Sequence, residues 1–157
     1  MAKTNKSIVR ASAASTSSYV ASTAFACSSL DWVEVEIDMI AGAASDQAMV
    51  VLEITKDDLS TPTASRVWKP LTAQDGTLTS QSIGTPPTSA AYGNFGFAVP
   101  GYYNVVLTTP VAAALNDKVT RSAVLFVGSA KYIRAQVKAA AGTPAVAVTM
   151  SGFSTGK

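Results

Sequence analysis

Histidine is absent from this sequence and cysteine occurs once, which excludes several kinds of catalytic and metal site. A Ser-His-Asp triad uses an imidazole as its general base, and a cysteine nucleophile normally needs the same partner. Zinc sites are built from several Cys and His ligands, which this chain lacks. We expect Cys27, which follows Ala24-Phe25-Ala26, to be a small buried residue. A chain without disulfides also fits assembly in a reducing cytoplasm.

Charge is scarce as well. Charged residues make up 14% of the chain, against about 25% in a typical soluble domain. The net charge is +2, and Lys and Arg are scattered rather than clustered, so the sequence does not indicate a nucleic-acid partner. Ser and Thr supply most of the remaining polarity. Such a surface suits packing against like subunits, because a domain that stays monomeric at high concentration usually carries more charge.

Long hydrophobic runs are missing too. No run approaches the roughly 20 apolar residues of a membrane-spanning helix, and no signal-peptide segment follows the basic N-terminus. We therefore expect a protein without membrane contact. The length of 157 residues suits one domain. Residues 1–15 are polar, small and aperiodic, which predicts a flexible N-terminal arm, and residues 16–157 form the domain.

Alternation of apolar and polar side chains is the strongest pattern that is present. In residues 31–40 one face would carry Val33, Val35, Ile37 and Met39, and the other Trp32, Glu34, Glu36 and Asp38. This pattern predicts a half-buried strand. Residues 47–55, which follow a segment rich in turn-forming residues, are predicted to be its antiparallel hairpin partner.

Further short strands are predicted along the chain. They are residues 17–27, 66–68, 92–99, 102–109, 120–127, 131–138 and 145–150. Residues 123–127 are continuously apolar, which predicts a strand buried on both faces. The polar tract 72–91 contains Pro86-Pro87 and is expected to be an exposed binding segment. Seven to nine short antiparallel strands with regular turns indicate an all-β domain, a β-sandwich or jelly-roll-like fold.

Two acidic motifs invite a chemical interpretation. Glu34, Glu36 and Asp38 would share one strand face at spacings of about 7 Å, comparable to the carboxyl pairs of glycosidases. We interpret this row as the solvated face of an exposed strand. Asp57-Asp58 and Asn116-Asp117 do not fit a calcium-loop spacing and are interpreted as turn residues. The sequence therefore predicts no enzyme, and no catalytic, cofactor-binding or metal-binding residue.

Aromatic residues are the best candidates for an interface, because aromatics dominate binding hot spots. The candidates are Trp32, Trp68, Tyr92, Tyr102 and Tyr103. Trp32 is the most suggestive, because it shares the outward face with Glu34 and Glu36. An outward Trp needs a partner, either another subunit or a covering loop.

Two neighbouring segments near the C-terminus carry a resemblance to a known class of protein. They are Lys131-Tyr132-Ile133-Arg134-Ala135-Gln136-Val137 and Gly142-Thr143-Pro144-Ala145-Val146-Ala147-Val148-Thr149-Met150-Ser151-Gly152. A Tyr-Ile-Arg-x-x-Val strand, a Gly-Thr turn and a closing strand of small apolar residues resemble the C-terminal hairpin of small virion proteins from tailed bacteriophages. The Ala, Ser and Thr richness, low charge and lack of His are similar as well.

The resemblance is greatest to capsid decoration (cement) proteins, which are compact β-rich domains, often trimeric, on the outer capsid. It implies a non-enzymatic virion protein, assembled in the host cytoplasm, that stabilises a capsid by bridging neighbouring subunits. Its partners would be the major capsid protein and copies of itself, with a homotrimer favoured. The resemblance carries over no functional residues and implies no cofactor.

Two alternatives stay open at this point. One is a neck, tail or head-fibre component of a phage, with a similar β fold. The other is a carbohydrate-binding or adhesive β-sandwich module, because sugar binding uses exposed Trp and Tyr beside carboxylates.

Overall fold

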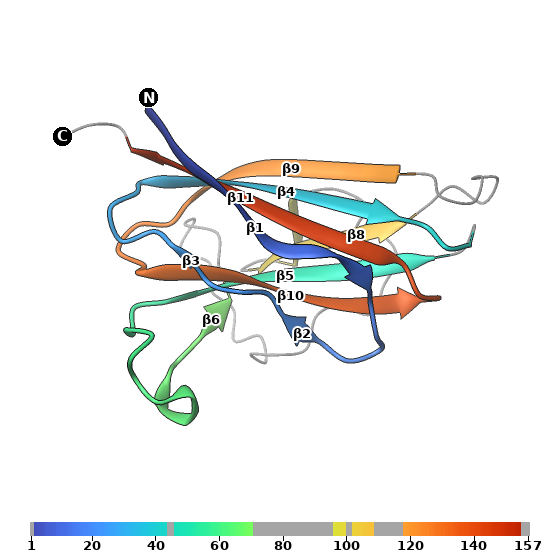
Figure 1. The fold of residues 1–157 in the computed structure, drawn as a ribbon, viewed down its shortest axis with the longest axis horizontal. Coiled ribbons are helices and arrows are strands. Elements are labelled where there is room, and N and C mark those ends of the chain that lie inside the picture. Colours follow the sequence, from blue (N-terminus) through green and yellow to red (C-terminus); the bar gives the residue numbers. More distant parts are fainter. Residues whose placement is uncertain (1, 44–45, 71–95, 100–101, 109–117, 155–157) are drawn as a thin grey trace.

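The computed structural model describes residues 2–43, 46–70, 96–99, 102–108 and 118–154. These residues form two antiparallel sheets in a β-sandwich-like arrangement, which confirms the all-β prediction (Figure 1). Sheet A has the order β1-β11-β4-β9, and sheet B the order β2-β10-β5-β8-β7. Two short strands lie off that path, β3 on β10 and β6 on β5.

The strands have the following bounds. Sheet A contains β1 (Ala2–Ala14), β4 (Trp32–Ile40), β9 (Lys118–Phe126) and β11 (Ala145–Ser154). Sheet B contains β2 (Val20–Ala21), β3 (Phe25–Ala26), β5 (Gln47–Thr55), β6 (Lys69–Pro70), β7 (Gly96–Val99), β8 (Tyr102–Thr108) and β10 (Tyr132–Ala141). A short 3₁₀ helix, Thr63–Ser65, precedes β6.

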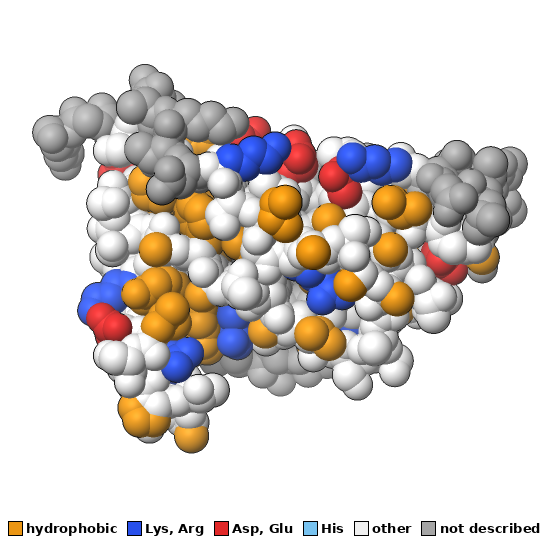
Figure 2. Space-filling view, in the orientation of Figure 1, with side chains coloured by type: hydrophobic (Ala, Val, Ile, Leu, Met, Phe, Trp, Pro, Cys, Tyr) orange, Lys and Arg blue, Asp and Glu red, His pale blue; other side chains and the backbone are white. Residues whose placement is uncertain are grey.

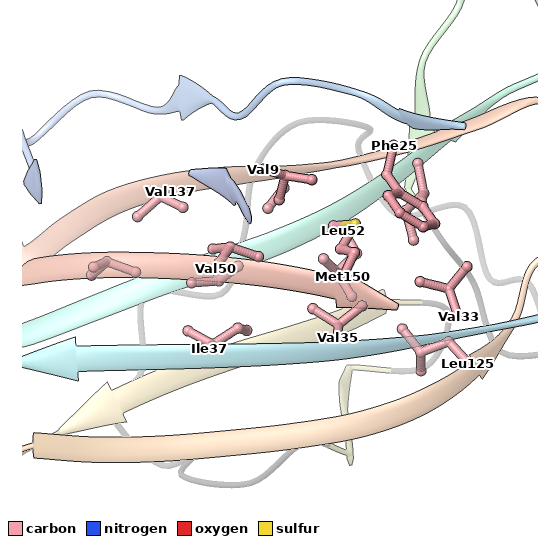
Figure 3. Packing of buried hydrophobic residues seen from close by; sticks show 14 of the residues in the cluster. Val9, Phe25, Val33, Val35, Ile37, Val50, Leu52, Leu125, Val137 and Met150 are labelled. Atoms are coloured by element: carbon pink, nitrogen blue, oxygen red, sulfur yellow. The ribbon is translucent and has the colours of Figure 1, made fainter. Parts of the chain in front are cut away.

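The core lies between the two sheets, where apolar side chains from both meet (Figure 3). The four apolar residues predicted for the inner face of β4 are fully buried, which confirms that prediction. They face the buried side chains of β5 and β10, among them Val50, Leu52 and Ile133. Each such side chain contributes about 1.5–3 kcal/mol through its removal from water.

The hairpin predicted from residues 31–40 and 47–55 is wrong, although both strands exist. β4 pairs with β11 and β9 in sheet A, whereas β5 pairs with β10 and β8 in sheet B. The chain therefore crosses between the sheets after β4. Alternation indicates which side chains face the core, but strands of either sheet satisfy it equally well.

The C-terminal hairpin on which the phage resemblance draws is not a hairpin either. β10 lies in sheet B and β11 in sheet A, and the two strands do not pair with each other. Gly142, with a φ of 65°, lies in the connection that takes the chain from one sheet to the other.

The flexible arm predicted for residues 1–15 is largely a strand. Residues 2–14 form β1, which pairs with β11 along its length. The sequence showed no alternation here because backbone pairing supplies most of the contact. Val9 is the one buried apolar side chain of β1 in the part whose burial is described, residues 6–14.

Three smaller predictions also need correction. Residues 120–127 are not a doubly buried strand, because β9 is an edge strand of sheet A and Val124 is 57% exposed. Residues 66–68 are not a strand, and residues 17–27 contain only the two-residue strands β2 and β3. The tract 72–91 lies outside the described residues.

Candidate interaction surface

The outward side of sheet A is here called face A. It is formed by Lys6, Ile8, Trp32, Glu34, Glu36, Asp38, Lys118, Thr120, Ser122, Val124, Phe126, Thr149 and Phe153. Ser151 has the same orientation in the register but is buried. The antiparallel register aligns these residues in rows that cross the strands. One row is Phe153, Trp32 and Phe126, and the next is Ser151, Glu34 and Val124.

The aromatic row gives face A its apolar end. The rings of Trp32 and Phe126 meet edge to face, with centroids 5.1 Å apart and planes at 64°. Phe126 is 36% exposed, and Val124 beside it more so. The outward position predicted for Trp32 is thus confirmed, and its ring partner is a residue of the neighbouring strand. Phe and Trp are among the residues that are enriched at protein interfaces.

The acidic row of β4 is partly neutralised on face A itself. Lys6 of β1 lies 3.7 Å from the Glu36 carboxylate, and Lys118 of β9 lies 2.9 Å from that of Asp38. Burial alone would raise the pKa of Asp38, but the Thr120 hydroxyl, which donates at 2.6 Å, and Lys118 hold this pKa below its ordinary value. Figure 2 shows acidic beside basic side chains and a largely uncharged surface around them.

Trp68 precedes β6 and packs against sheet B, on the opposite side of the molecule's core from face A. The Arg134 guanidinium stacks over its ring, 4.0 Å from the centroid, and also donates to the Glu53 carboxylate from Nε at 2.8 Å. Gln136 donates to the same carboxylate oxygen. This stack fixes the segment before β6 against the outward side of sheet B. Trp32 and Trp68 therefore belong to different surfaces.

The three tyrosines add little to this description. Tyr92 lies outside the described residues. Tyr102 and Tyr103 are the first residues of β8 and pair with Val99 and Phe97 of β7. The sequence did not single out Ile8, Val124, Phe126 or Phe153, because only the register of four separated strands places them together.

No family model, curated protein or solved structure matches this chain. Any function has to be inferred from the chain's own residues. Within the described residues, no three His, Cys, Asp or Glu side chains lie close enough to hold a metal ion. No helix in the same part of the chain is long and apolar enough to cross a membrane.

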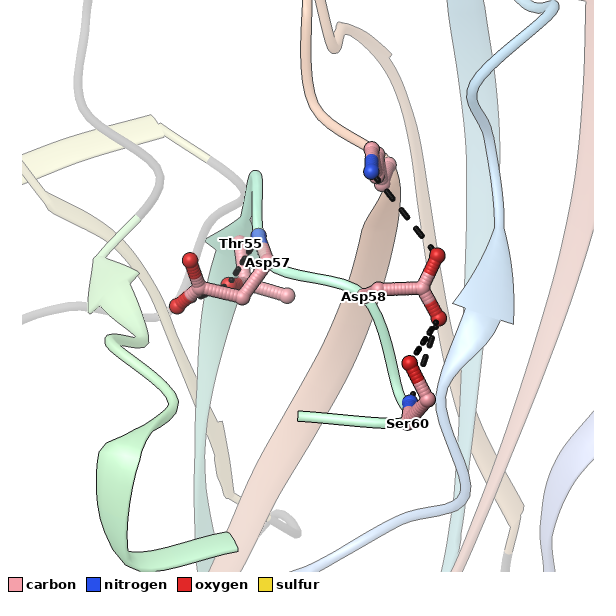
Figure 4. A network of polar contacts seen from close by, with 5 residues as sticks. Thr55, Asp57, Asp58 and Ser60 are labelled. Carbon is pink, nitrogen blue, oxygen red and sulfur yellow. Dashed lines mark hydrogen bonds and ion pairs between the residues drawn. The ribbon is translucent and has the colours of Figure 1, made fainter. Parts of the chain in front are cut away.

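The Asp57-Asp58 pair makes most of its contacts within the loop after β5, and Asp58 also lies 3.8 Å from the Lys131 ammonium group of the turn before β10 (Figure 4). Asp58 accepts hydrogen bonds from the backbone and the hydroxyl of Ser60, both at 3.1 Å, and these bonds lower its pKa. Asp57 accepts the backbone N–H of Val67 at 2.6 Å. Both carboxylates thus behave as turn residues, as the sequence indicated. Asn116-Asp117 lies outside the described residues.

Cys27 is fully buried, as predicted, and its Sγ lies 3.5 Å from the Ala130 carbonyl oxygen. Burial raises the pKa of the thiol to about 12 from an ordinary 9.0. At pH 8 the thiolate population is then lower by about three orders of magnitude. We expect no reaction of the folded protein with a thiol-specific disulfide reagent at pH 8, and complete reaction in denaturant.

The matched control for this measurement is Cys27→Ala combined with Ser28→Cys, which moves the thiol to an exposed neighbour. That variant should react within seconds in the folded state. Rapid reaction of the unmodified protein under native conditions would contradict the buried position of Cys27.

Proposed function

We propose that this protein is a non-enzymatic virion protein that decorates a phage capsid and stabilises it by bridging neighbouring subunits. The observation that supports this most is face A, a sheet surface with an exposed aromatic and aliphatic end. The low charge and the Ala, Ser and Thr richness agree with it. The β-sandwich-like fold is also typical of such proteins, whereas the C-terminal segments no longer count as a shared hairpin.

Face A suits a protein surface as partner. Val124, Phe126 and Ile8 project apolar area that a facing subunit can remove from water. The ion pairs of Lys6 with Glu36 and of Lys118 with Asp38 keep charges compensated within the face. Docking then does not leave an isolated buried charge, which would be costly. Many weak contacts of this kind act together when copies cover a shell.

Val124→Lys is expected to weaken binding to expanded capsids of the same phage by about 10- to 100-fold, because it replaces exposed apolar area next to Phe126 with a solvated ammonium group that docking would have to strip of water. The change should leave the fold intact, since Val124 points to solvent in the isolated chain. Binding is measured by co-sedimentation, and stabilisation by the temperature at which capsids release their contents.

Val67→Lys is the matched control, because Val67 is as exposed as Val124, at 57%, but lies in the segment before β6. It should bind like the unmodified chain. If the unmodified protein neither binds expanded capsids nor raises their disruption temperature, the capsid role is wrong. Electron microscopy that places the copies at a single vertex would favour the neck or tail alternative instead.

A further inference from the structure

β1 is held to the body mainly through its backbone. Along the described side chains of residues 6–14, only Val9 is buried, and Ile8 is 69% exposed. The ladder to β11 has irregularities at three places, between Thr4 and Lys6, between Ile8 and Arg10, and between Arg10 and Ala13. The side-chain contacts of β1, from Lys6 to Glu36 and from Arg10 Nε to Val146 O, are made to groups that a second copy would present in the same positions.

A cleft opens beside Ser7 of β1. Its volume is about 700 Å³, and its walls include Ser7 of β1, Phe25 of β3, Leu30 and Ser154 of β11. Side chains of the facing segment therefore do not fill the space beside Ser7, whereas Thr23 further along donates to the Val9 carbonyl oxygen from its backbone N–H at 3.0 Å and from its hydroxyl at 2.8 Å. Packing at Ser7 holds β1 less firmly than it holds the inner strands, because unfilled space forfeits dispersion contacts.

The connection from β1 to β2, residues 15–19, contains a buried hydroxyl group without a hydrogen-bond partner. Ser15 is 3% exposed, and its Oγ finds no hydrogen-bond partner within the described part of the chain. An unsatisfied buried hydroxyl destabilises the conformation that buries it. Two backbone bonds oppose this effect, Ser15 N–H to Pro144 O at 2.8 Å and Ala139 N–H to Thr16 O at 2.6 Å. The two backbone bonds stabilise the present conformation of residues 15–19, and the unsatisfied Ser15 hydroxyl destabilises it. We treat this connection as the hinge of β1.

The edge of β11 that pairs with β1 would, in contrast, be left with unpaired backbone groups if β1 were absent. Val146, Val148 and Met150 of β11 are fully buried, and β1 is the outer neighbour of their strand. Without β1 the backbone edge of β11 would be open, and an open edge is a template for another chain. Any copy of β1 presents the same backbone groups and the same Val9.

We propose that β1 exchanges between copies of this protein, so that β1 of one chain pairs with β11 of a second chain. The ladder and the Val9 contact are the same in the closed and the exchanged forms, and only the hinge differs. Exchange of an identical element is a low-cost route to an oligomer, and short hinges under strain promote it. The inference does not rest on the capsid role, since it concerns contacts between copies alone.

The experiment uses the pair Ile8 and Thr149, which face each other across β1 and β11 on face A. Directly opposed residues of antiparallel strands lie within reach of a disulfide. Full-length Ile8→Cys and Thr149→Cys chains carrying different tags are co-expressed, purified through both tags in turn, and oxidised. Exchange holds the two thiols at an effective concentration of about millimolar, so the mixed disulfide should form at least tenfold faster than by collision.

The control pair is Ile8→Cys with Ser122→Cys, which lies in the same row of face A but on β9, three strands away. In addition, the double variant Ile8→Cys/Thr149→Cys reports the closed form through a disulfide within one chain. Buried Cys27 is checked by oxidising the unmodified protein.

Strand exchange is supported if the yield of mixed disulfide is well above that of the 8–122 pair when the cysteines are at 8 and 149. This result holds whether or not the protein binds capsids. Equal and low yields from both pairs, together with a purely intrachain link in the double variant, would overturn it. A capsid-binding protein with that second result would retain the proposed function and lose only the exchange.

Discussion

Gly142→Ala is expected to lower the free energy of unfolding by about 3 kcal/mol. Two effects add at this position. Gly142 has a φ of 65°, in the left-handed region that side chains with a Cβ disfavour by about 1–2 kcal/mol. A Cβ there would also overlap Oδ1 of Asp46 and lie 2.7 Å from its Cγ.

Asp46 cannot move aside without loss, because it organises the crossing from β4 to β5. It is 2% exposed, and its carboxylate accepts the backbone N–H groups of Gly42 at 2.7 Å and Ala43 at 3.2 Å. Hydrogen bonds to a charged group contribute about 1.5–3 kcal/mol each. The new methyl group would therefore disturb two of the connections between the sheets, because Asp46 lies between β4 and β5 and Gly142 lies between β10 and β11.

Gly128→Ala provides the matched control. Gly128 also has a positive φ, 54°, but a Cβ there would meet only the Phe126 ring, at 3.3 Å. Its cost should be about 1 kcal/mol, from the backbone conformation alone. Denaturant unfolding measures both variants, and in an Asp46→Ala background the difference between them should shrink. Equal costs for the two substitutions would show that the contact of Gly142 with Asp46 contributes nothing.

The sequence predicted the burial of side chains well where one face of a strand meets the core. Val33, Val35, Ile37 and Met39 are buried as their alternation indicated, and the same holds for Ile133, Ala135 and Val137 of β10. Period-two alternation reports a local contrast between core and solvent, which each strand shows by itself. The class of fold follows from several such strands.

Pairing between strands could not be predicted in the same way. Residues on either side of a connection, such as Ile40 and Gln47, were assigned to one hairpin although their strands lie in different sheets. Buried Asp46 in that connection resembles an ordinary turn residue in the sequence. The strand β1 gave no signal either, because its contribution is backbone pairing beside a single buried side chain.

Only part of face A was predicted, because alternation within one strand shows which way a side chain points but not which strands lie beside it. Trp32 was recognised as outward because its own strand alternates. Phe126 and Val124 were assigned to a buried run, since residues 123–127 are apolar without interruption. In the structure β9 is an edge strand, so Leu125 faces the core and its two neighbours face solvent. An exposed apolar face produces the same uninterrupted run in the sequence as burial on both sides.

Leu125→Lys and Val124→Lys separate these two interpretations. Leu125 is 3% exposed and belongs to the core cluster, so an ammonium group there would be buried without a partner. We expect Leu125→Lys to cost about 4 kcal/mol or more, enough to unfold a domain of ordinary stability. Val124→Lys should change the free energy of unfolding by about 1 kcal/mol or less, the range of exposed strand positions.

The adjacent positions make the comparison strict, because strand, substitution and added charge are the same. Val124 also lies opposite Glu34 in the register, so the new ammonium group gains a carboxylate neighbour across the strands. Thermal and denaturant unfolding give the two free energies. Comparable losses at both positions would mean that β9 is covered on both faces, as the uninterrupted apolar run predicted. In that case face A would be an interior surface, and its aromatic row would pack within the chain rather than against a partner.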